Sequence, residues 1–283
     1  MHIGIIGLGL IGGSLGLDLR SQGHYVWGLS RSQSTCNQAI DIGVTDFAGL
    51  SLGDIKTFAQ TDVIFICTPI DAILKTIEAI APHLDSSIIL TDVGSVKASI
   101  VHAAQKIHPR FIGGHPMAGT AFSGINAAQA NLFQGRPCVL TPNDSSDPEA
   151  LNILRSLWQS VGAVVYECDP EIHDRAVAWI SHLPILVSAG LILACDQEPD
   201  QAIAQLSKHL ASSGFRDTSR VGGGNPQLGT LIAEYNQKAL LGSLKQYQAV
   251  LANLIQQIES GNWQNLEKSL VLAQELRNSY LII

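Results

Sequence analysis

The stretch Gly7-Leu8-Gly9-Leu10-Ile11-Gly12 decides the fold. It follows the apolar run His2–Ile6 and opens a segment with helical periodicity, so the sequence predicts a strand that turns directly into a helix. In such a G-x-G-x-x-G turn the first glycine permits the tight turn, the second lets a pyrophosphate approach the backbone, and the third lets helix and strand pack closely. The phosphates lie at the N-terminus of the helix, where the helix dipole is positive. The stretch predicts a dinucleotide-binding site made by Gly7, Gly9, Leu10, Ile11 and Gly12.

More apolar runs typical of buried strands follow, and most alternate with helical patterns. They are Tyr25–Leu29, Val63–Thr68 and Ile88–Val93, then Pro137–Thr141 and Ala163–Glu167. Alternation of this kind is typical of a sheet whose strands run mostly parallel and whose two faces are both covered by helices. We therefore expect an α/β fold with a doubly wound, mostly parallel sheet.

From Pro170 onward the alternation stops and only helical patterns remain. These patterns cover Pro170–Asp196, Pro199–Ser212, Thr230–Glu259 and Trp263–Tyr280. We therefore predict two domains, an α/β domain at residues 1–168 and an all-α domain at residues 169–283.

The composition describes a folded and acidic protein. Hydrophobic residues make up 46% of the chain and charged residues 14%, which excludes intrinsic disorder. The 17 Lys and Arg residues against 24 Asp and Glu give a net charge of −7, and no basic run occurs. This argues against nucleic acid or an anionic membrane surface as the main partner.

The five cysteines lie far apart, with no C-x-x-C pair and an odd total. This spacing predicts free thiols in a reducing compartment and neither a disulfide framework nor a zinc site. The chain begins directly with strand-like sequence, without the basic and apolar regions of a signal peptide. We therefore expect a cytoplasmic protein, and since other potential metal ligands are also scattered, we expect no metal.

The segment Ala176–Cys195 contains no Asp, Glu, Lys or Arg and is long enough to span a bilayer. It also contains His182 and Pro184, and no aromatic belt or Lys/Arg cluster flanks it. A helix that is apolar around its circumference is found in protein cores as well as in membranes. We therefore expect this helix to be buried in a soluble dimer or domain core, and we expect no membrane partner.

The end of the second predicted strand distinguishes NAD from NADP. An acidic residue about 20 residues after the glycine motif would bind the ribose 2′-hydroxyl of NAD. The sequence there has no acid but has Ser30 and Arg31. Arg31 can pair with a 2′-phosphate and Ser30 can donate its hydroxyl, which predicts NADP. Thr68 and Pro69, at the end of the next long strand, are expected to line the ribose or the nicotinamide.

Two further motifs follow, and the first lies at the same predicted edge of the sheet. The first, Asp92-Val93-Gly94-Ser95-Val96-Lys97, comes directly after a strand. The second contains Gly113-Gly114-His115-Pro116, which we interpret as a tight loop that holds a histidine. Imidazole is the side chain best suited to accept a proton near neutral pH. His115 is therefore our candidate for a general base.

A third group of candidate residues lies in the helical half. Ser181-His182-Leu183-Pro184 interrupts the long apolar helix. We interpret the segment from Gly214 to Pro226 as a glycine-rich loop, and it contains Arg216 and Arg220. Two arginines beside a glycine run in an acidic protein point to a site for a carboxylate.

Taken together and in this order, these motifs resemble those of the prephenate and arogenate dehydrogenases of tyrosine biosynthesis. The resemblance covers nearly the whole chain and is greatest to the short, monofunctional arogenate dehydrogenases. It implies a Rossmann-like NADP-binding domain, a helical domain that forms a homodimer, and oxidative decarboxylation of a cyclohexadienol to an aromatic product.

The resemblance also implies a role for each candidate residue. His115 matches the catalytic histidine that contacts the C4 hydroxyl, and Ser95 matches a serine near that hydroxyl and the nicotinamide. Arg220 matches an arginine that holds a substrate carboxylate, His182 matches an active-site histidine, and Arg216 stands where some relatives have lysine. One departure concerns the substrate, because Ala121 replaces an acidic residue of some prephenate-using relatives.

The expected reaction is therefore the NADP-dependent conversion of arogenate to tyrosine. A prephenate dehydrogenase that makes 4-hydroxyphenylpyruvate, or a cyclohexadienyl dehydrogenase that uses both substrates, is the alternative. A β-hydroxyacid dehydrogenase would need a lysine in the second domain, and none of the candidates there lies in a suitable motif: Lys208, Lys238, Lys245 and Lys268. A non-catalytic NADP-binding sensor would bind the cofactor without turnover.

The apolar helix generates a prediction about assembly. A domain of about 115 residues cannot cover the hydrophobic circumference of Ala176–Cys195 by itself, so we expect a homodimer with a large apolar interface. Sedimentation should give a dimer, and a concentration-independent monomer near 30 kDa would contradict this expectation.

Overall fold

The computed structural model describes residues 1–54, 58–120 and 122–280. The chain divides into two compact units. The first unit comprises Met1–Val177 and Gly223–Tyr235, and the second comprises Ala178–Gly222 and Asn236–Ile283. This division falls at Val177, whereas the sequence-based boundary at residue 168 stays a prediction.

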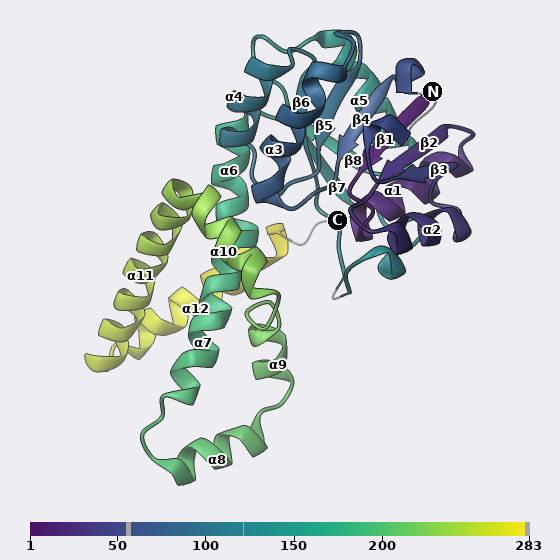
Figure 1. The fold of residues 1–283 in the computed structure, drawn as a ribbon. Coiled ribbons are helices and arrows are strands. Elements are labelled where there is room, and N and C mark those ends of the chain that lie inside the picture. The colour runs from purple at the N-terminus through teal and green to yellow at the C-terminus, as the bar shows by residue number, and fades with distance from the viewer. Residues whose placement is uncertain (55–57, 121, 281–283) are drawn as a thin grey trace. The chain divides into compact units, whose positions relative to one another are not determined.

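The first unit is built on one mixed sheet, which within the described residues has eight strands in the order β3-β2-β1-β4-β5-β6-β7-β8 (Figure 1). Every neighbouring pair is parallel except β6 and β7, which are antiparallel. The strands are β1 (His2–Ile6), β2 (Tyr25–Leu29), β3 (Phe47–Gly49), β4 (Val63–Ile66), β5 (Ile89–Asp92), β6 (Phe111–Pro116), β7 (Pro137–Thr141) and β8 (Val164–Glu167). The predicted doubly wound, mostly parallel sheet is confirmed.

Helices cover both faces of this sheet (Figure 1). Those with residues in the main hydrophobic cluster are α1 (Leu10–Ser21), α2 (Gln33–Asp41) and α5 (Pro148–Ser160). The helices α3 (Ile70–Ile80), α4 (Ala98–Ile107) and α6 (Pro170–Val177) form a second layer, in which α4 packs on α3, α6 and β6. The helix α10 (Pro226–Tyr235) also belongs to this unit.

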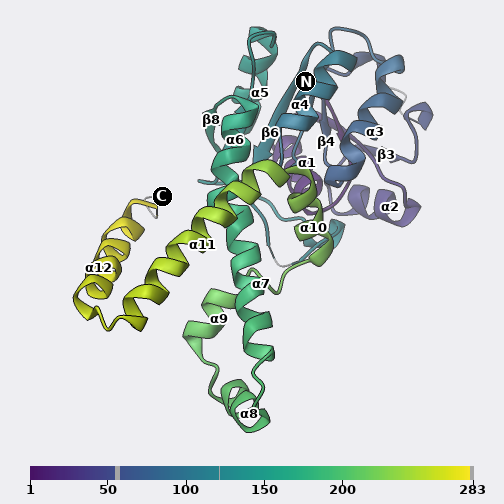
Figure 2. The ribbon, with the colours of Figure 1, turned by 90° about the vertical axis from the view of Figure 1, so that its left-hand side faces the viewer.

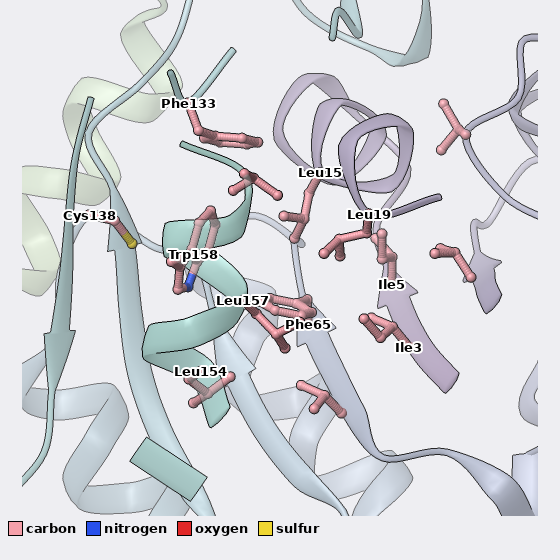
Figure 3. Packing of buried hydrophobic residues seen from close by; sticks show 14 of the residues in the cluster. Ile3, Ile5, Leu15, Leu19, Phe65, Phe133, Cys138, Leu154, Leu157 and Trp158 are labelled. Carbon is pink, nitrogen blue, oxygen red and sulfur yellow. The ribbon is translucent and has the colours of Figure 1, made fainter. Parts of the chain in front are cut away.

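The core between the first helix layer and the sheet explains why the amino-terminal pattern folds as it does (Figure 3). Leu15 and Leu19 of α1 and Ile5 of β1 are all buried in this cluster. Further along the sheet, Trp158 of α5 meets Phe65 edge to face, with ring centroids 5.7 Å apart. Each large buried side chain of this kind contributes about 1.5–3 kcal/mol to folding, so the core fixes α1 and α5 on the sheet.

Two strands differ from the sequence-based prediction. The short strand β3 was not predicted, and neither was β6. His115 therefore lies on a strand and not in a tight loop, which corrects our interpretation of Gly113–Pro116. The segment reads as a turn because it contains two glycines and a proline, yet it pairs with β7, with His115 opposite Val139.

The second unit is helical, as predicted. It begins with a turn of π-helix at Ala178–His182. The helices that follow are α7 (Leu183–Asp196), α8 (Gln201–Leu210), α9 (Ser213–Ser219), α11 (Gln237–Glu259) and α12 (Trp263–Tyr280). The predicted helix Pro170–Asp196 is thus interrupted where Pro184 enters the chain, because proline lacks an N–H for the helical ladder. Residues 214–219, which we expected in a loop, are helical and belong to α9.

Large apolar side chains of the second unit are exposed in the chain. The helices α11 and α12 lie side by side (Figure 2) and carry several of them: Leu241, Val250, Ile255, Ile258, Leu270, Leu272 and Leu276. Among the described residues, Pro170–Asp196 is the one helical stretch long and apolar enough to cross a membrane by length and composition. Exposed apolar surface of this extent is typical of a protein–protein interface.

Candidate functional site

The glycine turn between β1 and α1 leaves room for a ligand. Gly7 has a φ of +106°, and a Cβ atom there would lie 2.5 Å from the carbonyl oxygen of Cys67, so no other residue fits without strain. A Cβ atom at Gly9 would have nothing within 4 Å. Gly9 also precedes α1 without a side-chain cap for the first N–H groups of the helix. Open space and uncapped donors fit the phosphates of a dinucleotide.

Two hydroxyl groups lie at the same edge of the sheet as this turn. Thr68 follows β4 and Ser95 follows β5, and the two strands are parallel neighbours. The hydroxyl oxygens of Thr68 and Ser95 are inaccessible to solvent and have no hydrogen-bond partner. Pro69 directly precedes α3. Because buried hydroxyls are nearly always hydrogen-bonded, these two point to a ligand, and the residues present fit a dinucleotide cofactor.

The predicted 2′-phosphate residues lie after β2. Arg31 is exposed, and the hydroxyl of Ser30 accepts a hydrogen bond from the backbone N–H of Ser32, at 3.3 Å. The hydroxyl of Ser32 in turn caps α2 by accepting from Thr35 N–H, at 3.4 Å. Arg31 therefore directly precedes Ser32, the N-cap residue of α2, and both an arginine and a helix amino terminus favour a negatively charged group.

His115 lies near the carboxyl end of β6 and is buried, with 7% of its surface exposed. Its Nδ1 atom is 2.8 Å from Nε2 of His173, and the two rings meet edge to face. Nδ1 of His173 is 2.8 Å from a carboxylate oxygen of Asp174. A chain of hydrogen bonds thus connects the candidate base on the sheet to a carboxylate on α6.

The motif Asp92–Lys97 forms the support beneath His115. Asp92 and Lys97 are fully buried and form an ion pair. The ammonium of Lys97 also donates to the carbonyl oxygen of Gly114, at 2.9 Å. Asp92 accepts further hydrogen bonds from the backbone N–H groups of Gly94 and Gly114. Burial lowers the pKa of Lys97, and the carboxylate of Asp92 acts in the opposite direction.

Asp174 connects these contacts into a closed loop of hydrogen bonds. Its carboxylate accepts the backbone N–H groups of Lys97, at 2.7 Å, and Ala98, at 2.9 Å, where α4 begins. Lys97 therefore takes part in this closed loop of hydrogen bonds twice: its ammonium contacts β6, and its backbone N–H contacts Asp174 on α6. The positions of His115, His173 and Asp174 are consequently fixed by one network of hydrogen bonds.

Sequence reasoning missed His173 and Asp174. They lie in a short segment of mixed polarity, Pro170–Val177, that contains no recognisable motif. No sequence signal distinguishes them from the neighbouring polar residues Asp169, Glu171 and Arg175. Only the structure shows that both are buried, which is unusual for such residues.

The remaining candidate residues belong to the second unit. His182 is buried, and its Nδ1 accepts a hydrogen bond from the side-chain amide of Asn236, at 3.1 Å. Arg216 and Arg220 are exposed, and Arg216 forms an ion pair of 3.2 Å with Asp217. Asn236 was also missed from the sequence.

The arginine segment is tied to α7 by one side chain. The hydroxyl of Ser188 donates to the carbonyl oxygen of Thr218, at 2.8 Å, and accepts from the N–H of Gly222, at 2.9 Å. Arg220 therefore extends from an anchored backbone. The sequence position Ala121, which bears on substrate choice, lies outside the described residues.

Within the described residues, no group of three or more His, Cys, Asp or Glu side chains is arranged to hold a metal ion.

Comparison with known families gives two matches that together cover most of the chain. The nucleotide-binding domain of prephenate dehydrogenase matches residues 15–167. The dimerization domain of prephenate dehydrogenase matches residues 169–272.

Individual relatives agree with these matches. The prephenate dehydrogenase of Bacillus subtilis is 30% identical over 97% of this chain and 74% of that protein. The cyclohexadienyl dehydrogenase of Zymomonas mobilis is 33% identical over 89% of this chain and 87% of that protein.

Solved structures agree as well. Synechocystis arogenate dehydrogenase is 51% identical, with a TM-score of 0.90, over 99% of this chain and 100% of that one. The prephenate dehydrogenase from A. aeolicus, solved in complex with hydroxyphenyl propionate and NAD+, is 26% identical, with a TM-score of 0.93, over 99% of this chain and 98% of that one.

Proposed function

The chain belongs to the prephenate dehydrogenase family, and from that premise we propose that it converts L-arogenate to L-tyrosine with NADP as the hydride acceptor. Family membership establishes a nucleotide-binding dehydrogenase of the prephenate/arogenate type, and the dimerization-domain match supports a homodimer. It also decides against the β-hydroxyacid dehydrogenase considered from the sequence. A cytoplasmic location stays a prediction.

One observation carries the proposal of a catalytic base. The buried imidazole of His115 lies at the carboxyl edge of β6, and its Nδ1 is already engaged by His173. Because parallel strands place their carboxyl ends at one edge, His115 shares that edge with the glycine turn, Thr68 and Ser95. A general base beside a dinucleotide site is what oxidation of a hydroxyl-bearing carbon requires.

The proposed reaction balances with few protein groups. Nε2 of His115 accepts the proton of the C4 hydroxyl, while C4 gives up its hydride. The C1 carboxylate leaves as carbon dioxide, the electrons of the broken carbon–carbon bond complete the aromatic ring, and the phenolate oxygen regains a proton from His115. The bound nicotinamide supplies the two-electron acceptor.

Other residues are assigned to binding. Ser95 is assigned to catalysis together with His115, and its unpartnered hydroxyl is proposed to hydrogen-bond the C4 hydroxyl. Arg220 is assigned to a substrate carboxylate, because guanidinium groups pair bidentately with carboxylates. His182 and Arg216 are assigned as further substrate contacts.

The cofactor is assigned to residues at three turns. Its phosphates are assigned to Gly7, Gly9, Leu10, Ile11 and Gly12, its 2′-phosphate to Ser30 and Arg31, and its ribose or nicotinamide to Thr68 and Pro69.

Arogenate is proposed as the substrate on the strength of the 51% identical arogenate dehydrogenase, which matches over the full length. Prephenate is the second candidate, since other relatives are named for prephenate or cyclohexadienyl substrates. Initial rates with arogenate and prephenate, each with NADP and NAD, test the assignment. We expect the highest kcat/KM for arogenate with NADP, and a preference for prephenate would overturn the choice of substrate.

Replacing Arg31 tests the choice of cofactor. Arg31→Ala should raise KM for NADP, by the equivalent of about 1.5–3 kcal/mol for one charge-assisted hydrogen bond, and leave the weaker NAD reaction nearly unchanged. Lys106→Ala, which removes an exposed positive charge from α4, is the control and should change neither KM. Equal losses with NADP and NAD would contradict the assignment.

Replacing His115 tests the base. Asparagine keeps hydrogen-bonding groups but cannot accept the proton, so His115→Asn should lower kcat by about 10²- to 10⁴-fold while NADP binding, followed by fluorescence, stays close to wild type. Wild-type kcat/KM should fall as the pH drops, because the imidazole must be neutral to act.

The acid limb of this pH profile supplies the control. It should disappear in His115→Asn and survive in His182→Asn, because His182 is assigned to substrate contact. A limb that persists in His115→Asn, or that disappears in His182→Asn, would show that another group is the base.

A further inference from the structure

We propose that His173 and Asp174 are positioning residues that fix the tautomer of His115, so that Nε2 of His115 carries the lone pair that takes the substrate proton. The inference rests on the proposed role of His115 as the base. It concerns the hydrogen-bonded chain from α6 to β6, whose two contacts are each 2.8 Å long.

The carboxylate of Asp174 decides which atom donates in each of these hydrogen bonds. The carboxylate of Asp174 can only accept, so Nδ1 of His173 donates its proton to it. In neutral His173 the other ring nitrogen, Nε2, then has no proton and accepts from Nδ1–H of His115. With its proton on Nδ1, His115 has a basic Nε2, and any proton transfer by this ring occurs there.

The helix α4 holds in place the Asp174 carboxylate, at which this series of hydrogen bonds ends. Asp174 accepts hydrogen bonds from the backbone N–H groups of Lys97 and Ala98 in addition to the one from His173. The positive amino-terminal end of α4 stabilises the negative charge on Asp174. His173 links that charge to the base, since its two ring nitrogens contact Asp174 and His115.

The hydrogen bonds from Asp174 through His173 also stabilise the protonated form of His115. When His115 takes a proton, the positive charge forms 2.8 Å from His173 in a buried site, and His173 transmits the attraction of Asp174. The other titratable groups around β6 contribute less: Asp92 and Lys97 neutralise each other, and burial raises the pKa of the Cys138 thiol on β7, which keeps it neutral.

A purely structural role would not require this arrangement. Asp174 can cap α4 without any contact to His173. The ring of His173, 1% exposed, could be replaced by an apolar side chain of similar size without cost if it served only to fill space. Instead, both of its nitrogens are used, one toward the base and one toward the carboxylate.

Nitrogen-15 NMR of the histidine rings in the cofactor-free protein tests the tautomer directly. The signals of His115 are identified by their loss in His115→Asn. We expect neutral His115 to carry its proton on Nδ1 in the wild type and on Nε2 in His173→Leu, since a histidine without this constraint favours the Nε2–H form. The same tautomer in both proteins would overturn the inference.

Kinetics provide the second measurement. We expect His173→Leu to lower kcat by about 10²-fold, with KM for arogenate little changed, because the base remains but is wrongly protonated. The acid limb should move to lower pH, since the attraction of Asp174 for the protonated base is lost. His173→Gln offers a carbonyl oxygen to Nδ1–H of His115 and should recover most of the rate and the wild-type tautomer.

A matched control separates positioning from stability. His108 is also buried, and its Nε2 lies 2.6 Å from the carbonyl oxygen of Ile88, away from His115. Both His108→Leu and His173→Leu should lower the unfolding temperature, because each removes a buried hydrogen-bonded ring. His108→Leu should change neither the tautomer of His115 nor the pH profile.

The outcomes distinguish the two proposals. Substantial activity in His115→Asn would overturn the base assignment itself. A large loss of kcat in His115→Asn, together with a wild-type rate, pH profile and tautomer in His173→Leu, would overturn only the positioning role. A His173→Gln protein that behaves like His173→Leu would also overturn the positioning role.

Discussion

The buried ammonium of Lys97 is the interaction on which the rest of the site depends. It pairs with Asp92 at the end of β5 and donates to the carbonyl oxygen of Gly114 on β6, while its own backbone N–H binds Asp174 on α6. Taking both charges out of water is costly, and the protein compensates by satisfying the carboxylate with further backbone N–H groups. Removal of either partner would leave an unpaired buried charge, at a cost of about 3–5 kcal/mol.

The geometry around Lys97 determines how His115 can act. Gly114 is needed because a Cβ atom there would lie 2.7 Å from the carbonyl oxygen of Asp92, so β6 could not close on β5 with a larger residue. The next residue, His115, is thereby held at the carboxyl edge of the sheet with Nδ1 toward His173. The same edge carries the glycine turn and the unpartnered hydroxyls of Thr68 and Ser95. Lys97 thus supports the strand that bears His115 through its ammonium and the helix that bears His173 through its backbone N–H.

Sequence reasoning predicted the parts of this structure that are encoded locally. Continuous apolar runs located β1, β2, β4 and β5, and the glycine motif located the turn before α1. The strand β6 was missed because its glycines and proline are typical of turns, and its pairing with β7 depends on residues far along the chain. His173 was missed for a related reason: its partner His115 is 58 residues away, and no local pattern marks the contact. The segment with Arg216 was expected to be a loop because its glycine and hydroxyl residues have low helix propensity, yet α9 forms there.

A double-mutant cycle between His115 and His173 tests the central claim most directly, because it measures whether the two residues act as one unit. The rates compared are kcat/KM for arogenate in the wild type, His115→Asn, His173→Leu and the double variant. If His173 acts through His115, the second substitution should cost almost nothing once the first is present, so the double variant should match His115→Asn. Losses that multiply in the double variant would show that the two residues act independently, and would contradict the account.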